Sequence, residues 1–205
     1  MILPSITIDQ LKGIKMPKIL TFAGSGRKNS YNFSIAKCAA QGADLDGVEV
    51  TVIDMSEFDM PIFNEDLEAA CGLPANAKKF KQLLMLHDGF IIASPEYNSG
   101  YSGLLKNAID WASRMEEGEK PLQAFKGKHA AIVAASPGAL GGIRGLVSLR
   151  MLLGNLGMHV LPNQLAVGGI GKLVDKDHNV VDEKTKKNLN VIGRTLAEAL
   201  LQAAK

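Results

Sequence analysis

The sequence has few cysteines, few aromatic residues and no long apolar run. Its 205 residues include only Cys38 and Cys71, which are too few for a disulfide framework or a structural zinc site. The longest strongly apolar runs, such as residues 130–135, fall far short of the ~20 residues that span a bilayer. These absences argue against a secreted mini-protein and a membrane-spanning protein. They predict a cytoplasmic protein with no bound metal.

A dominant charge of either sign is also absent. Lys and Arg number 23 and Asp and Glu number 21, giving a formal net charge of +2. That charge is too small and too evenly mixed to indicate a nucleic-acid-binding protein. Apolar residues make up 46% and charged residues 21%, the proportions of an ordinary globular domain rather than a disordered chain.

The first fifteen residues stand apart from the rest of the chain. They lack the basic n-region of a signal peptide and carry Asp9 within the first apolar stretch. Met16 and Pro17 come immediately before the first strand-like run. Residues 1–15 are therefore predicted to be an N-terminal extension, which either lies outside the core or covers a sheet edge. Residues 16–205 are predicted to form a single domain.

Short apolar runs alternate with segments of helical periodicity along the chain. Runs that are apolar on both faces are typical of a parallel α/β sheet covered by helices on both sides, and right-handed crossovers make such a sheet doubly wound. Five strands and five helices fit the flavodoxin-like order 2-1-3-4-5 better than a six-stranded dinucleotide fold. The predicted strands are Lys18–Ala23, Val48–Ile53, Gly89–Ser94, His129–Ser136 and His159–Pro162, the last of which could extend to Val167; the predicted helices are residues 30–43, 76–87, 103–116, 141–156 and 183–204.

The loop after the first strand combines glycines, hydroxyls and a cation. Ligands of open parallel sheets bind at the carboxyl ends of the strands, where the strand order reverses, and for this order those are the loops after strands one, three and four. Glycines allow N–H groups to point inward, and the following helix adds its positive end. With Ser25, Ser30 and Asn32 as neutral hydrogen-bonding groups and Arg27 as a guanidinium, the loop predicts a phosphomonoester cradle.

Two better-known phosphate motifs do not match this loop. Asn29 occupies the position of the third glycine of a dinucleotide fingerprint, and no Gly-Lys-Ser/Thr follows for a triphosphate loop. The alternative interpretation is an ordinary glycine turn in which Ser30 or Asn29 caps the next helix.

The loops after the third and fourth predicted strands are equally unusual. Residues 94–103 contain a proline, a glutamate, two tyrosines and two glycines, and predict an exposed polar loop whose N–H groups can meet the edge of a ring system. Residues 136–144 contain three glycines, which favour close approach of the backbone to a ligand. The alternative for residues 94–103 is a turn that caps the next helix, and the alternative for residues 136–144 is a flexible connection.

These three loops resemble those of the NADPH-dependent FMN reductases, which include chromate, quinone and azo-dye reductases. The resemblance runs from about Lys18 to the C-terminus, and it departs from the family pattern at Gly26 and Pro137. The matching elements are Gly24-Ser25-x-Arg27-x-x-Ser30-x-Asn32, Pro95-Glu96-Tyr97-Asn98 with the following residues 105–111, and Ser136-x-Gly138-x-x-Gly141-Gly142-x-Arg144.

The resemblance implies a non-covalent FMN cofactor and NADPH or NADH as the hydride donor, with quinones, chromate or azo dyes as acceptors. Because FMN itself carries the redox chemistry, no catalytic side chain is nominated. A homo-oligomer, either a dimer or a homotetramer, is also implied, with residues 59–66 and 104–116 near the subunit boundary. The implied FMN-binding residues are Ser25, Arg27, Ser30, Tyr31 and Asn32 from the first loop, Pro95, Glu96, Tyr97 and Asn98 from the second, and Ser136, Gly138, Gly141 and Gly142 from the third.

Other functions remain open on the sequence alone. One is a flavodoxin-like electron carrier. Flavodoxins are usually strongly acidic and enclose the flavin between aromatic side chains, whereas this chain is slightly basic and only 5% aromatic, which argues against this function. The others are a flavin-binding sensor module and a phosphate-binding domain without flavin. The physiological acceptor and the choice between NADPH and NADH are not readable from the residues.

Overall fold

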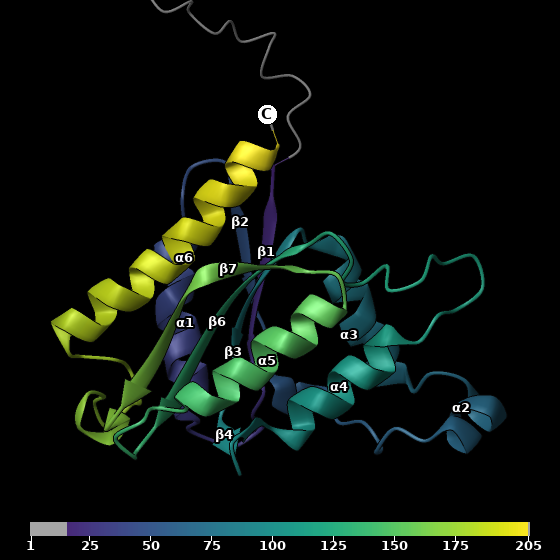
Figure 1. Ribbon diagram of the computed structural model, residues 1–205, viewed down its shortest axis with the longest axis horizontal. Helices are drawn as coiled ribbons and strands as arrows, with labels where there is room; N and C mark the ends of the chain where they lie inside the picture. Colours follow the sequence, from purple (N-terminus) through teal and green to yellow (C-terminus); the bar gives the residue numbers. More distant parts are fainter. Residues whose placement is uncertain (1–15, 205) are drawn as a thin grey trace, which may run out of the picture.

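A computed structural model describes residues 16–204; the predicted N-terminal extension lies outside the described residues. Its centre is a five-stranded parallel sheet with the order β2-β1-β3-β6-β7 (Figure 1). Because β4 and β5 form a separate hairpin, this is the predicted order 2-1-3-4-5 when only the strands of the central sheet are counted. The strands of this sheet are β1 (Lys18–Ala23), β2 (Glu49–Val52), β3 (Gly89–Ala93), β6 (His129–Ser136) and β7 (His159–Gly168).

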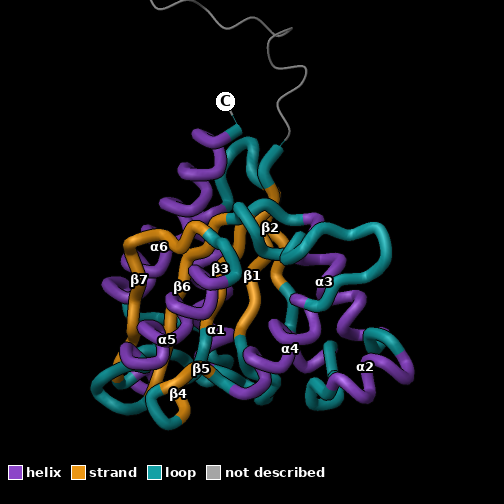
Figure 2. The backbone as a smooth tube through the Cα atoms, turned by 45° about the vertical axis from the view of Figure 1, so that its right-hand side comes forward, coloured by secondary structure: helices purple, strands orange, loops and turns teal. Residues whose placement is uncertain are grey.

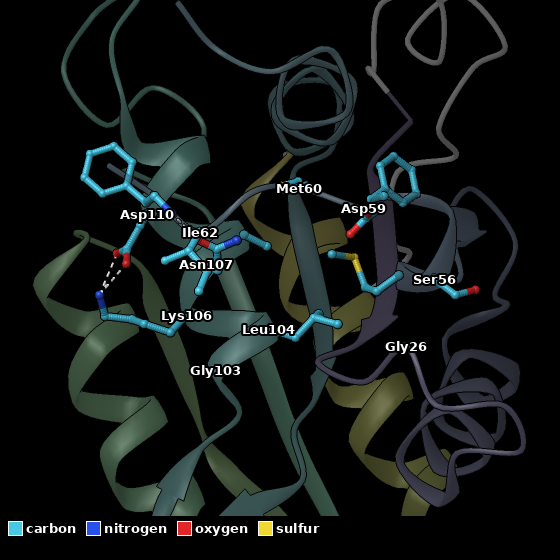
Figure 3. Close-up of a pocket in the computed structure, with 14 residues that line it drawn as sticks. Gly26, Ser56, Asp59, Met60, Ile62, Gly103, Leu104, Lys106, Asn107 and Asp110 are labelled. Atoms are coloured by element: carbon cyan, nitrogen blue, oxygen red, sulfur yellow. Dashed lines mark hydrogen bonds and ion pairs between the residues drawn. The ribbon is translucent and has the colours of Figure 1, made fainter. Parts of the chain in front are cut away.

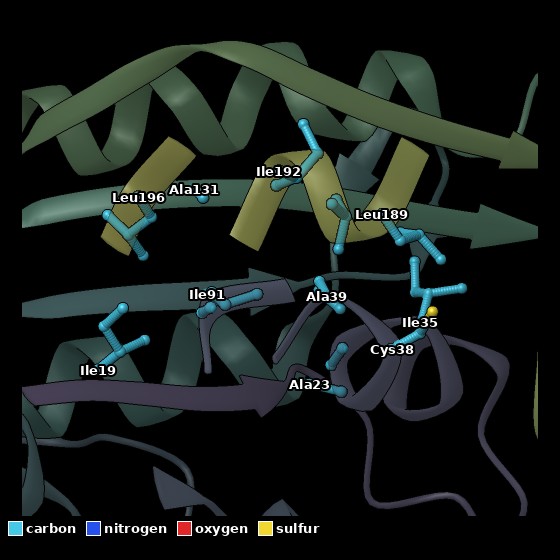
Figure 4. Close-up of a cluster of buried hydrophobic side chains, with 14 of the residues drawn as sticks. Ile19, Ala23, Ile35, Cys38, Ala39, Ile91, Ala131, Leu189, Ile192 and Leu196 are labelled. Carbon is cyan, nitrogen blue, oxygen red and sulfur yellow. The ribbon is translucent and has the colours of Figure 1, made fainter. Parts of the chain in front are cut away.

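Helices cover both faces of this sheet, as the apolar runs predicted. Alternate residues of the central strands point to opposite sides: Ile19 and Ile91 pack in one core cluster, and Leu20 and Ile92 pack in the other. The first face is covered by α1 (Tyr31–Ala43) and α6 (Glu183–Ala203), and the second by α3 (Ala75–Leu86), α4 (Gly103–Ser113) and α5 (Ile143–Asn155). Figure 4 shows the first cluster, in which side chains of α1 and α6 meet the sheet.

Capping side chains mark where most of the helices begin. Ser30, Asn64, Ser102 and Asp182 each accept hydrogen bonds from N–H groups in the first turn of α1, α2 (Glu65–Cys71), α4 and α6. Helix α5 differs, because its N-cap residue is Gly142, which has no side chain to offer.

Several short elements were not predicted. They are α2, the hairpin of β4 (Glu96–Tyr97) and β5 (Gly100–Tyr101), and the 3₁₀ turns η2 (Met55–Glu57) and η3 (Ile170–Lys172). Strand β7 has the longer of the two predicted extents and contains Pro162, which is tolerated because β7 is an edge strand. No helix among residues 16–204 combines the length and apolar character needed to cross a bilayer.

Candidate cofactor-binding site

The three predicted loops converge at the carboxyl edge of the sheet. They enclose a cavity of about 270 Å³ between the start of α1, the β4–β5 hairpin and the end of β6. Of the predicted residues, only Asn98, Gly138, Gly141 and Gly142 do not line it. The lining residues are Ser25, Arg27, Ser30, Tyr31, Asn32, Pro95, Glu96, Tyr97, Ala135, Ser136 and Pro137.

The first loop presents hydrogen-bond donors and an uncompensated cation. Ser30 caps α1 by accepting from the N–H of Phe33 at 3.4 Å, which confirms one of its predicted roles. Within residues 16–204, no group accepts from the N–H of Tyr31 or Asn32, and no carboxylate pairs with Arg27. The Arg27 guanidinium lies over the Tyr31 ring, 5.3 Å from its centroid. A helix start with open N–H groups beside an arginine is chemically suited to a phosphomonoester.

The Asn32 side chain has a second task that the sequence did not reveal. It is buried, and its Oδ1 accepts from the N–H of Ala135 at 2.9 Å while its Nδ2 donates to the Ala135 carbonyl at 3.1 Å. The amide therefore joins the start of α1 to the end of β6. Its backbone N–H remains part of the open helix start.

The second loop is a hairpin rather than an irregular loop. Asn98 and Ser99 have φ of 51° and 67°, so both central residues are left-handed, as a two-residue type I′ turn requires. Ser102, at the end of the hairpin, caps α4 and donates its hydroxyl to the carbonyl of Gly24. That bond attaches the second loop to the first, and Tyr97 is left exposed at the rim of the cavity.

The Glu96 carboxylate points toward α5. Its Oε2 accepts from the N–H groups of Arg144 and Gly145, both at 3.0 Å, and its Oε1 accepts from the Arg144 guanidinium at 2.9 Å. The hydrogen bond from Gly145 is the main cause that lowers the pKa of Glu96, and Arg144 lowers this pKa further. The side chain therefore serves the protein's own helix, while its residue still lines the cavity.

The glycines of the third loop are explained by packing against the protein itself. Gly141 and Gly142 have φ of 62° and 92°, and a Cβ at Gly141 would lie 2.6 Å from the backbone nitrogen of Gly168. A Cβ at Gly142 would lie 2.8 Å from the Cβ of Ala134. Close approach of a ligand is therefore not needed to account for glycine at either position.

A second, larger cavity of about 910 Å³ lies on the other side of the first loop. Gly26, η2, residues 58–63 and the start of α4 surround it (Figure 3). Asn107 accepts from the N–H of Phe63 at 2.7 Å, and Trp111 donates to the carbonyl of Pro61 at 2.8 Å, so segment 58–63 is held on α4. Trp111 is fully buried and packs in a small hydrophobic cluster with Leu73 and Ala77.

The match to a family model covers most of the chain. The model of the NADPH-dependent FMN reductases matches residues 17–172. The chain belongs to this family. It is 36% identical over 171 residues to the NAD(P)H-dependent FMN reductase PA1204 of Pseudomonas aeruginosa, covering 83% of this chain and 88% of that one. It is 33% identical over 174 residues to a quinone reductase of Escherichia coli (strain K12), covering 84% and 89%.

The solved structure of a flavoenzyme has the same fold. The structure of FerB, a flavoenzyme NAD(P)H:(acceptor) oxidoreductase from Paracoccus denitrificans, matches with a TM-score of 0.74 and 28% identity. The match covers 91% of this chain and 98% of that chain. In this FMN reductase, the cavity between the three loops is thus the candidate cofactor site.

Proposed function

We propose that the protein is an FMN-dependent NAD(P)H oxidoreductase that passes electrons to small acceptors of the quinone class, with chromate and azo dyes as further candidates. The observation that carries the proposal is the first loop: Arg27, Tyr31 and Asn32 line one cavity at the switch point of the sheet, and the N–H groups of Tyr31 and Asn32 have no acceptor among residues 16–204. When bound, FMN supplies hydride acceptance from NAD(P)H and electron delivery to the acceptor.

The residues of the site bind and orient. Arg27 and the N–H groups of Tyr31 and Asn32 would hold the phosphate, and Ser25 and Ser30, which line the same cavity, would add hydroxyls. Tyr97 of the β4–β5 hairpin would lie beside the ring, and Ser136 and Pro137, which also line the cavity, would close the opposite side. No side chain is proposed as a general acid, a general base or a nucleophile.

Binding of FMN tests the phosphate site. Arg27→Ala removes a charge-assisted hydrogen bond worth about 1.5–3 kcal/mol, so FMN affinity should fall by roughly 10- to 150-fold. Lys28→Ala is the matched control. It removes the same positive charge one residue away, and Lys28 does not line the cavity. The readout is quenching of flavin fluorescence in a titration. Unchanged affinity in the Arg27 variant would remove the phosphate assignment, and failure of the wild type to bind FMN would remove the function.

Turnover separates the reductase from its alternatives. The FMN-loaded protein should oxidise NADPH or NADH in the presence of a quinone, whereas an electron carrier or a sensor module would bind FMN without nicotinamide turnover. A panel of quinone, ferric chelate, chromate, azo dye and nitroaromatic, at matched NADPH and NADH, would also rank acceptors and donors.

We further propose that residues 16–205 form a single cytoplasmic FMN domain that assembles as a homo-oligomer, a dimer or a tetramer. Both cysteines are free, as expected in a reducing compartment. Ile62 is 85% exposed beside the larger cavity, and α5 exposes Ile143, Val147 and Met151 at spacings of four residues. Exposed apolar side chains aligned in this way are typical of interaction surfaces.

A further inference from the structure

Helix α5 starts without a capping side chain of its own. Its N-cap residue, Gly142, has φ of 92°, and a Cβ there would lie 2.8 Å from the Cβ of Ala134. Serine, threonine or aspartate, the usual caps, therefore cannot occupy this position without displacing β6. The open N–H groups of the first turn need an acceptor from elsewhere in the chain.

Glu96 supplies that acceptor from 48 residues earlier in the sequence. One carboxylate oxygen accepts from the N–H groups of Arg144 and Gly145, and the other is 2.9 Å from both Nε and Nη2 of Arg144. Gly145 permits the approach, because a Cβ there would lie 3.2 Å from both the Cβ of Glu96 and the carbonyl of Gly100. Two glycines and one glutamate thus fit together as a set.

This contact fixes the relative position of two loops of the site. Glu96 begins β4, so its bonds hold the β4–β5 hairpin against the start of α5, where the third loop ends. Figure 2 shows the hairpin beside α5 at the carboxyl edge of the sheet. The Glu96 residue also lines the cavity with Arg27 and Ser136, so any shift of the hairpin changes the cavity itself.

The same contact sets the charge at this side of the cavity. The Glu96 side chain is only 10% exposed and faces two positive features, the N-terminus of α5 and the guanidinium of Arg144, which is 60% exposed. Removing the carboxylate leaves both features unpaired. Removing the guanidinium leaves the carboxylate with only the helix terminus.

We propose that Glu96 is a positioning residue of the flavin site, which acts through Arg144 and Gly145 to hold the hairpin on α5 and to set the reduction potential of bound FMN. The proposal rests on the proposed FMN-dependent function. It assigns the carboxylate to the helix and leaves contact with the flavin to the hairpin backbone.

The test compares Glu96→Gln, Arg144→Gln and the double variant, all loaded with FMN. Excess positive charge near a flavin favours its reduction, so the midpoint potential should rise in Glu96→Gln, fall in Arg144→Gln and lie between the two in the double variant. Lys106→Gln and Asp110→Asn break an ion pair on α4 that lines the larger cavity instead, and they should leave the potential unchanged.

FMN affinity provides the second measurement. Glu96→Ala removes the cap as well as the charge, and FMN should bind more weakly, by at most about 30-fold, which corresponds to the whole stabilisation that a helix cap provides. Arg144→Gln keeps the cap and folds even if the alanine variant does not, so the potential shift remains measurable. Equal potentials in Glu96→Gln and Arg144→Gln, or shifts in the same direction, would overturn the proposal. Wild-type protein that binds no FMN would instead overturn the function on which it rests.

Discussion

Buried polar side chains next to the cavity bind the backbone of the protein and thereby build the site. Asn32 and Ser102 are both buried, and each bonds the backbone of a different loop or strand. A buried backbone group is costly to leave unpaired, so these side chains fix the relative positions of the loops before any ligand arrives. Their partners are also the reason that sequence patterns alone did not reveal these roles: Ala135 lies 103 residues from Asn32 and Gly24 lies 78 residues from Ser102.

Replacing Asn32 should therefore destabilise the fold. Asn32→Ala leaves the N–H and the carbonyl of Ala135 without their amide partner, and the free energy of unfolding should fall by about 1–3 kcal/mol. Asn188→Ala, which removes an exposed amide from α6, is the matched control and should have little effect. Urea unfolding of the FMN-free protein measures both, and an equally stable Asn32 variant would show that the buried bonds contribute nothing net.

The Glu96 cap also predicts how stability depends on pH. The pKa of Glu96 in the folded protein is lowered from 4.5, first by the hydrogen bond from Gly145, so the folded state favours the ionised carboxylate. Its contribution is present above the unfolded pKa and is lost as the pH falls through the folded pKa. The difference in thermal midpoint between wild type and Glu96→Gln should be constant from pH 8 to about 5 and should shrink at lower pH. A difference that grows on acidification would contradict the assignment.

At the scale of elements, local signals were sufficient wherever a segment is long and buried. β1 and β6 have the predicted bounds because their residues are apolar on both faces. The capping of α1 by Ser30 was predictable because its partner, the N–H of Phe33, lies only three residues further along the chain. The hairpin was missed because two-residue strands carry no periodicity, although Asn98-Ser99 between tyrosines was an available turn signal. Helix α2 was missed because it has only 7 residues and buries none of them.

The crossing of α1 and α6 depends on two glycines. A Cβ at Gly193 would lie 1.9 Å from the carbonyl oxygen of Ala39, and one at Gly42 would lie 2.1 Å from that of Asn190. The helices therefore approach until their backbones meet, and any side chain at these positions must push them apart.

Alanine at two different helical glycines should consequently have opposite effects. Gly193→Ala should lower the free energy of unfolding by about 1–3 kcal/mol, because overpacking outweighs the gain in helix propensity. Gly154→Ala in α5, where a Cβ would meet nothing within 4 Å, should raise it by up to about 1 kcal/mol. Chemical denaturation of the two variants checks the pair, and a stabilised Gly193 variant would mean that the helices separate at no cost.

At the scale of the whole molecule, the alternation of strands and helices was enough to predict the sheet order and the edge where the three loops enclose the candidate site. Right-handed crossovers leave few ways to connect five parallel strands, and the switch point then follows from the order. The exposed apolar residues such as Ile62 and Val147 could not be predicted in the same way, because the sequence does not tell which apolar side chains of a covering segment face the sheet and which remain exposed.

The proposed assembly predicts how the mass of the protein in solution changes when a charged residue is introduced on the surfaces that carry these residues. The wild type should have a mass in solution of two or four times 21.9 kDa, as a dimer or a tetramer. A glutamate buried in an apolar interface loses its hydration without gaining a partner. Ile62→Glu should therefore break subunit contacts at the larger cavity, and Val147→Glu should break subunit contacts along α5. Each substitution should lower the mass of the assembly. Val191→Glu, which replaces an exposed valine on α6, is the control and should leave the mass unchanged. Light scattering after size exclusion measures all four proteins. A wild type at 21.9 kDa would contradict the assembly, and a loss of mass in only one variant would assign the interface to that surface alone.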